Sequence, residues 1–115
     1  MTVAEVDPFP AKVRALLNEA ECSELIAYVA RFPESGVVIP DTGGLRKLRW
    51  YAKGSGKRGG LRVIYYFYDE GWPVFLLSVY RKSQQEDLNS EQKKRLRSFV
   101  EILKKEMRAR GPRRR

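Results

Sequence analysis

The stretch Lys53-Gly-Ser-Gly-Lys-Arg-Gly-Gly-Leu-Arg-Val-Ile-Tyr-Tyr-Phe-Tyr68 decides which fold this chain adopts. Its second half, Leu61–Tyr68, is apolar on both faces, a pattern typical of a central strand. Its first half is a glycine-rich basic loop. Seven basic residues and no acid lie between Gly43 and Arg62: Arg46, Lys47, Arg49, Lys53, Lys57, Arg58 and Arg62. This concentration of positive charge favours a surface that meets phosphate groups.

The segments on either side of Leu61–Tyr68 predict two neighbouring strands. Leu45–Ala52 alternates, with Leu48 and Trp50 on one side and Lys47 and Arg49 on the other. Residues 73–81 follow a turn at residues 69–71, and loops this short predict an antiparallel meander. Two brief extended pieces, residues 2–7 and 37–40, bring the expected sheet to between three and five strands.

Three helices complete the expected fold. Apolar residues at helical spacing predict one helix from about Ala11 to Ala20 and a second that begins after Ser23 and stops before Pro33. A third helix begins at Asn89 or Ser90 and ends at residues 111–112. Its apolar stripe is Leu96, Phe99, Val100, Leu103 and Met107. The sequence therefore predicts one α+β domain over residues 1–110, followed by a mobile basic tail over 111–115.

The composition limits the chemistry. The 115 residues carry a net charge of +9 and no histidine, and Cys22 is the one cysteine. A chain without histidine has no histidine base and no histidine metal ligands. We therefore expect no metal and no cofactor. We also expect no membrane span, since no apolar run approaches the ~20 residues that a span needs. The N-terminus lacks a signal-peptide pattern, which predicts a cytoplasmic protein with an anionic partner. The alternative is that the net positive charge serves only to keep the protein soluble.

Arg62 stands out because it lies one residue into an otherwise apolar strand. A guanidinium there must be paired or must face a groove. A structural salt bridge to Asp69 or Glu70 is the alternative. Arg81 and Lys82 end the adjacent strand, so strand pairing is expected to bring three cations together where they can stabilise phosphate charge.

The basic loop has two interpretations. Gly54-Ser-Gly-Lys57 is similar to the end of a nucleotide-binding loop, but the pattern is incomplete and the loop joins two strands instead of opening a helix. Lys53, Lys57 and Arg58 fit a nucleic-acid backbone better. A plain hairpin loop is the alternative.

Other candidates are less specific. Tyr51, Tyr66 and Tyr80 are candidates for base stacking or proton transfer. Glu86 and Asp87 precede a helix start, where acids favour the helix dipole. The basic face of the last helix is either a solvated face or an RNA or ribosome contact; its residues are Lys93, Lys94, Arg97, Lys104 and Lys105.

Three segments together resemble the HigB branch of the RelE superfamily of bacterial toxins. They are Asp-Thr-Gly-Gly-Leu-Arg-Lys-Leu-Arg (41–49), Gly-Lys-Arg-Gly-Gly-Leu-Arg-Val-Ile-Tyr-Tyr (56–66) and Tyr-Arg-Lys-Ser-x-x-x-Asp-Leu-Asn (80–89). The resemblance implies two helices packed on a curved antiparallel sheet, plus a C-terminal helix. It implies a toxin that enters the ribosome and cuts messenger RNA without a metal, by attack of the 2′-hydroxyl on the adjacent phosphate. The implied partners are a cognate antitoxin that is a DNA-binding repressor, the ribosome and messenger RNA.

The resemblance also implies roles for individual residues. Arg62 would hold the scissile phosphate, and Lys82 or Arg81 would stabilise charge or assist the leaving group. Lys53 and Lys57 would orient RNA or, with a lowered pKa, take the hydroxyl proton. Tyr80 or Tyr66 would stand in for a tyrosine that RelE carries where this chain reads Glu86-Asp87-Leu88. The implied RNA and ribosome contacts are Arg46, Lys47, Arg49, Arg58, Tyr66, Lys93, Lys94 and Arg97.

The chain departs from this branch at Arg81, where a small residue is usual, and at Ser83, where asparagine is common. Two other functions stay open: a ParE-like protein that poisons DNA gyrase by binding, and a non-catalytic RNA-binding module. The fold alone does not choose among them.

Overall fold

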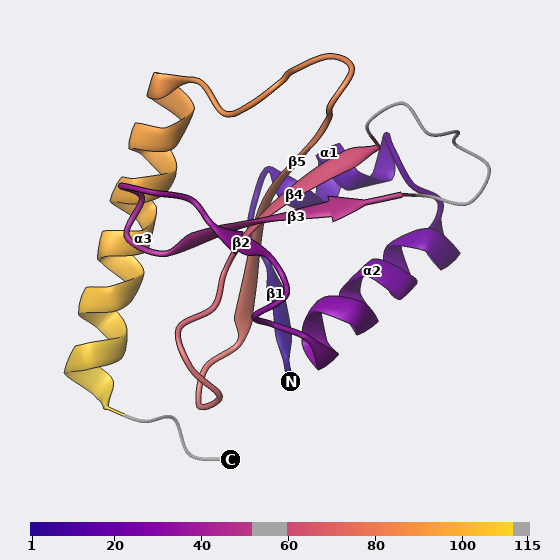
Figure 1. The fold of residues 1–115 in the computed structure, drawn as a ribbon. Helices are drawn as coiled ribbons and strands as arrows, with labels where there is room; N and C mark the ends of the chain where they lie inside the picture. Colours follow the sequence, from indigo (N-terminus) through magenta and orange to yellow (C-terminus); the bar gives the residue numbers. More distant parts are fainter. Residues whose placement is uncertain (52–59, 112–115) are drawn as a thin grey trace.

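The computed structural model describes residues 1–51 and 60–111, and within them five strands and three helices. Figure 1 shows their arrangement. In chain order the elements are β1 (Val3–Glu5), α1 (Phe9–Arg14), α2 (Glu19–Arg31), β2 (Val37–Val38), β3 (Leu45–Trp50), β4 (Leu61–Tyr66), β5 (Val74–Arg81) and α3 (Ser90–Arg110). The expected α+β class is confirmed. The tail expected to be mobile falls, from residue 112 on, outside the described residues.

The sheet is mixed, with the strand order β1-β5-β4-β3-β2. The predicted meander is present, because β3 pairs antiparallel with β4 and β4 antiparallel with β5. The expectation of a wholly antiparallel sheet was wrong, since β1 runs parallel to β5. No short turn joins these two strands, and a parallel pair is compatible with a long helical connection. Backbone bonds from Val74 N–H to the Thr2 oxygen and from Val6 N–H to the Leu76 oxygen complete the pairing.

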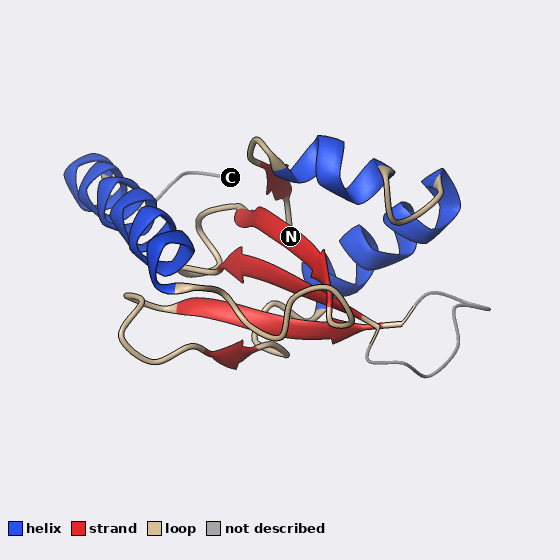
Figure 2. Ribbon diagram, turned by 90° about the horizontal axis from the view of Figure 1, so that it is seen from above, coloured by secondary structure: helices blue, strands red, loops and turns tan. Residues whose placement is uncertain are grey.

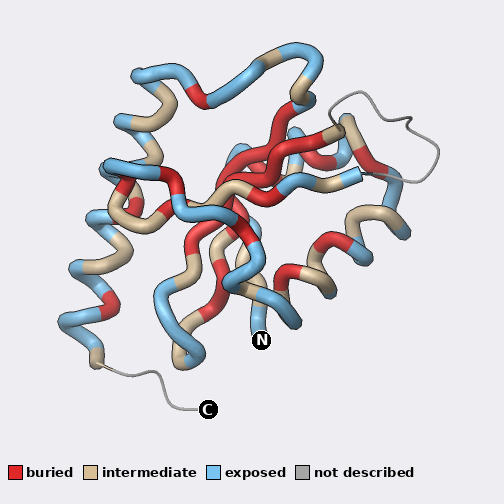
Figure 3. Tube along the Cα trace, viewed as in Figure 1, coloured by how far each residue is buried: buried red, intermediate tan, exposed pale blue. Residues whose placement is uncertain are grey.

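Helices cover both faces of the sheet, as Figure 2 shows. On one face, α1 and α2 contribute Phe9 and Leu25 to a core cluster that includes Val63 of β4. On the other face, α3 contributes Val100 to a second cluster with Ile64. Every residue of β4 is therefore buried, as its apolar pattern predicted, and the buried residues in Figure 3 gather along the central strands.

The helix starts show where the sequence interpretation was incomplete. The first helix is shorter and earlier than expected, Phe9–Arg14. The second begins at Glu19 and is capped by Asn18 instead of Ser23: Asn18 Oδ1 accepts from Glu21 N–H at 2.8 Å, and Glu21 Oε1 accepts from Asn18 N–H at 2.9 Å. This reciprocal capping box satisfies two backbone donors and determines the start. The expected cap Asn89 of α3 is confirmed by the same arrangement with Gln92.

No helix within residues 1–51 and 60–111 is both long enough and apolar enough to cross a bilayer.

Candidate functional site

One row of side chains crosses three neighbouring strands. Arg49 of β3 pairs with Arg62 of β4, and Arg62 pairs with Tyr80 of β5. Residues directly opposite each other in a sheet point to the same face. That face is the one covered by α3, because Tyr80 belongs to the same core cluster as Val100. We call Arg49, Arg62 and Tyr80 the cross-strand row.

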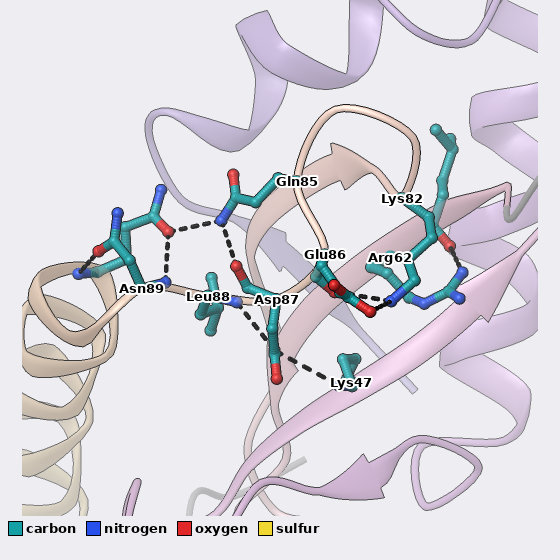
Figure 4. A network of polar contacts seen from close by, with 10 residues as sticks. Lys47, Arg62, Lys82, Gln85, Glu86, Asp87, Leu88 and Asn89 are labelled. Atoms are coloured by element: carbon teal, nitrogen blue, oxygen red, sulfur yellow. Dashed lines mark hydrogen bonds and ion pairs between the residues drawn. The ribbon is translucent and has the colours of Figure 1, made fainter.

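Arg62 is almost fully enclosed, with 6% of its surface exposed. Its Nη1 donates to the carbonyl oxygen of Leu61 at 3.3 Å. Asp69 and Glu70, considered above as salt-bridge partners, follow the opposite end of β4, roughly 13 Å along an extended strand from Arg62 to Tyr66. Arg62 pairs instead with Arg49 across the β3–β4 ladder, and Figure 4 shows Lys82 near its guanidinium.

Tyr80 carries a polar atom that the fold leaves unsatisfied. Only 8% of the residue is exposed, and its hydroxyl is the one buried side-chain polar atom without a hydrogen-bond partner among the residues that the structure describes. Burial raises the pKa of Tyr80, the Asp87 carboxylate adds to the rise, and Arg62 opposes it. The hydroxyl therefore keeps its proton at neutral pH, so it can donate a hydrogen bond but does not act as a base.

Two lysines beside the row are paired with acids of the loop 82–89. Lys82 Nζ lies 3.0 Å from the carbonyl oxygen of Glu86 and 3.6 Å from Glu86 Oε1. Lys47 Nζ lies 3.5 Å from Asp87 Oδ1. Figure 4 shows both pairs close to Arg62. Glu86 and Asp87 thus contact lysines, instead of serving mainly the dipole of α3 as expected.

Asp87 is held in its charged form. Although partial burial opposes ionisation, the Leu88 N–H, which donates to Asp87 Oδ1 at 2.8 Å, and the Lys47 ammonium keep the pKa of Asp87 below its usual value. Lys93, in the first turns of α3, also favours the carboxylate. The Asp87 carboxylate therefore offsets part of the positive charge beside the cross-strand row.

Amide side chains hold this loop against α3. Gln85 Nε2 donates to the Asp87 carbonyl oxygen at 2.9 Å and to Gln92 Oε1 at 2.6 Å. Leu88 is 6% exposed and packs in the core beneath α3. The loop therefore has a defined position beside the cross-strand row.

Three of the predicted site residues lie elsewhere. Arg46 donates through Nη1 to the carbonyl oxygens of Glu34 and Gly36, at 3.0 and 2.9 Å, so it braces the segment before β2. Arg81 pairs with Leu61, whose side chain packs with α1 and α2, and alternation turns it to that face.

Tyr66 is the third. It is 3% exposed, and burial raises its pKa to about 12. It lies four residues beyond Arg62 on β4, where its ring is covered and offers no stacking surface.

Of the remaining predicted site residues, some lie in the described part of the chain and others do not. Lys94 and Arg97 are exposed on α3, on the solvent side. Lys53, Lys57 and Arg58 lie outside the described residues. The sequence interpretation missed the roles of Asp87 and Gln85, although an acidic pair that follows the basic pair Arg81-Lys82 after three residues was an available signal.

No known protein-family model matches the chain. Among residues 1–51 and 60–111, no group of three or more His, Cys, Asp or Glu side chains is placed to hold a metal ion.

Proposed function

We propose that this protein is the toxin of a bacterial toxin–antitoxin pair, with a fold of the RelE type, acting in the cytoplasm as an endoribonuclease on messenger RNA in the ribosome. The observation that carries the proposal is the cross-strand row: two arginines and a protonated tyrosine hydroxyl side by side on one face. Such a row matches an RNA phosphate, which needs positive charge and a hydrogen-bond donor at developing negative charge.

The order of elements supports the proposed fold. Two N-terminal helices, an antiparallel β3–β5 meander and a long C-terminal helix occur in the sequence order that the family resemblance implies. The parallel edge strand β1 is an addition to that expectation.

In the proposed reaction the 2′-hydroxyl oxygen bonds to the adjacent phosphorus, and the bond from phosphorus to the 5′-oxygen breaks. The products are a cyclic phosphate and a free 5′-hydroxyl. Arg62 and Arg49 hold the non-bridging oxygens, and bidentate arginine contacts suit that geometry. The proton of the 2′-hydroxyl passes to the neutral amine form of Lys53 or Lys57, the role that the resemblance implies for a lysine with a lowered pKa. The leaving oxygen takes a proton from Tyr80 or Lys82.

Tyr80 fits the donor role for a physical reason. An unsatisfied buried hydroxyl costs on the order of 1–3 kcal/mol, and a phosphate oxygen would supply the missing acceptor. The raised pKa of Tyr80 keeps the proton available at neutral pH.

Primer extension on a message translated in vitro tests the proposal. We expect cuts in register with codons that depend on ribosomes and disappear in Arg62→Ala. The matched control is Arg81→Ala, which removes an arginine from the opposite face of the sheet and should leave cleavage intact. An intact message with unimpaired translation would overturn the proposal. In cells that express the protein, an induced DNA-damage response in place of translation arrest would favour gyrase inhibition.

A further inference from the structure

A second site lies away from the cross-strand row, at the edge of the sheet where β1 and β5 meet α3. A pocket of about 400 Å³ opens there, within the usual size range of small-molecule sites. It is bounded by the turn between β1 and α1, by β5 and by the first half of α3. Its lining residues are Val6, Asp7, Pro8, Lys12, Leu77, Ser78, Leu88, Gln92, Arg95, Leu96 and Phe99.

We infer that this pocket binds a small organic monoanion with an apolar body, such as an alkyl or aryl carboxylate. The inference does not rest on the proposed function, because neither the cross-strand row nor any proposed RNA contact lines the pocket.

The apolar part of the ligand is recognised by the floor and one wall. Leu77 and Leu88 are 2% and 6% exposed and form a rigid base that belongs to the core under α3. Leu96 and Phe99 of α3 are partly buried and face the same space. An apolar group that enters this space leaves water for a surface already formed, which is the usual basis of small-ligand binding.

The anionic part is recognised where α1 meets β5. Lys12 Nζ lies 3.5 Å from Ser78 Oγ, at the outer limit of a hydrogen bond, and Ser78 is 8% exposed. A serine hydroxyl donates as well as accepts, and within the described residues the Ser78 hydroxyl donates to no acceptor. The ammonium and the hydroxyl therefore offer two donors to one carboxylate.

The charges around the pocket select a single negative charge. Lys12 of α1 and Arg95 of α3 are the cations that line the pocket, and Asp7 is the one acid in its lining. Two cations against one carboxylate favour an anion, whereas Asp7 repels a second negative charge on the ligand. A carboxylate fits this balance better than a phosphate dianion.

The pocket walls are organised before any ligand binds. Gln92 Oε1 accepts from Gln85 Nε2 at 2.6 Å and from Asn89 N–H at 3.0 Å, which fixes the first turn of α3. A wall held in place loses little conformational entropy on binding, so a small ligand retains more of its interaction energy.

The test is a titration of the full-length protein with octanoate and, separately, with 1-octanol, followed by amide chemical shifts. We expect saturable shifts at Ser78, Leu96 and neighbouring residues, and an affinity for octanoate at least tenfold higher than for 1-octanol. Lys12→Gln and Ser78→Ala should each weaken octanoate binding several-fold while 1-octanol binding is unchanged. The matched control is Lys105→Gln, an exposed lysine of α3 that does not line the pocket.

Equal affinities for the two ligands, or octanoate binding that survives both substitutions, would overturn the inference. Shifts distributed over the whole surface would do so as well. The titration contains no RNA, so its failure leaves the proposed nuclease untouched, and a failed cleavage assay leaves this pocket untouched.

Discussion

Arg62 and Tyr80 occupy directly paired positions on β4 and β5, with 6% and 8% of their surfaces exposed. The pairing places a buried positive charge next to a buried hydroxyl that has no acceptor within the described part of the chain. Burial strengthens the attraction of both groups for an anion, because the local dielectric constant is low.

Tyr80→Phe separates the functional role of the hydroxyl from its cost to the fold. Removing an unsatisfied buried hydroxyl should leave the free energy of unfolding unchanged or raise it by up to about 3 kcal/mol, because the space left by the oxygen offsets part of the gain. RNA cleavage should fall on the order of 10²-fold, the loss typical of one transition-state donor. Urea denaturation and a ribosome-dependent cleavage assay measure the two quantities. Unchanged cleavage would remove Tyr80 from the proposed mechanism.

Asp87→Asn should strengthen RNA binding, because it frees Lys47 from its ion pair. Each additional phosphate contact should steepen the dependence of log affinity on log salt by about 0.7. Fluorescence anisotropy with a short single-stranded RNA at several salt concentrations measures both effects. Glu106→Gln is the matched control, since it makes the same charge change at a helix surface pair with Arg110. An equal change of slope in the two variants would contradict a specific role for Asp87.

The stability contributed by Asp87 should depend on pH in a defined direction. Its folded-state pKa is lower than the ordinary value of 3.8, so its charge stabilises the fold above that value. The contribution is lost as pH falls through the folded-state pKa. The difference in unfolding free energy between the protein and Asp87→Asn should be at most about 1 kcal/mol, because solvent screens this half-exposed pair.

Denaturation at a series of pH values measures this difference. It should be constant above roughly pH 5 and shrink toward zero below the ordinary pKa. A difference that grows as the pH falls would show that the Lys47–Asp87 pair does not stabilise the fold.

Substitutions of Arg46 and Arg49 should affect different properties, because an odd separation along β3 places the two side chains on opposite faces of the sheet. Arg49→Ala removes an exposed cation of the cross-strand row and should weaken RNA binding without a large change in stability. Arg46→Ala removes donors to Glu34 and Gly36 and should lower the free energy of unfolding by about 1 kcal/mol, with a smaller effect on RNA. Anisotropy and denaturation on both variants decide the matter; the reverse pattern would contradict the assignment of faces.

Tyr65→Phe should destabilise the fold. The Tyr65 hydroxyl donates to the Pro33 carbonyl oxygen and accepts from the Gly36 N–H, both at 2.8 Å. Its loss leaves the buried N–H of Gly36 without a partner, which costs on the order of 1–3 kcal/mol. Tyr68→Phe, at an exposed position, is the matched control and should change the unfolding free energy little. Equal stability of the two variants would show that water replaces the lost bonds.

Local patterns predicted much of the fold. The double-sided apolar run of β4 correctly indicated a strand buried on both faces, and the cap Asn89 correctly marked the start of α3. The sequence also contains the capping-box pattern of Asn18 followed three residues later by Glu21, but the prediction placed the cap at Ser23. Alternation along Leu45–Trp50 could also have separated Arg46 from Arg49, because side chains two or four positions apart share a face and odd separations do not.

Other features depended on long-range packing. The parallel pairing of β1 with β5 joins residues about seventy positions apart, such as Val3 and Val74. The pair Lys47–Asp87 bridges 40 positions. No local propensity encodes such partners, because they are selected by which faces can be buried together and by the register that results.

The sequence by itself determined the strands of the meander, the presence of three helices and the excess of positive charge, since these follow from periodicity, turn residues and composition. Only the tertiary structure decided that Arg49, Arg62 and Tyr80 form one row, that Arg81 turns away, and that Asp87 meets Lys47. A change of register by one residue would turn every one of these side chains to the opposite face, and register depends on the packing of the whole sheet between α1, α2 and α3.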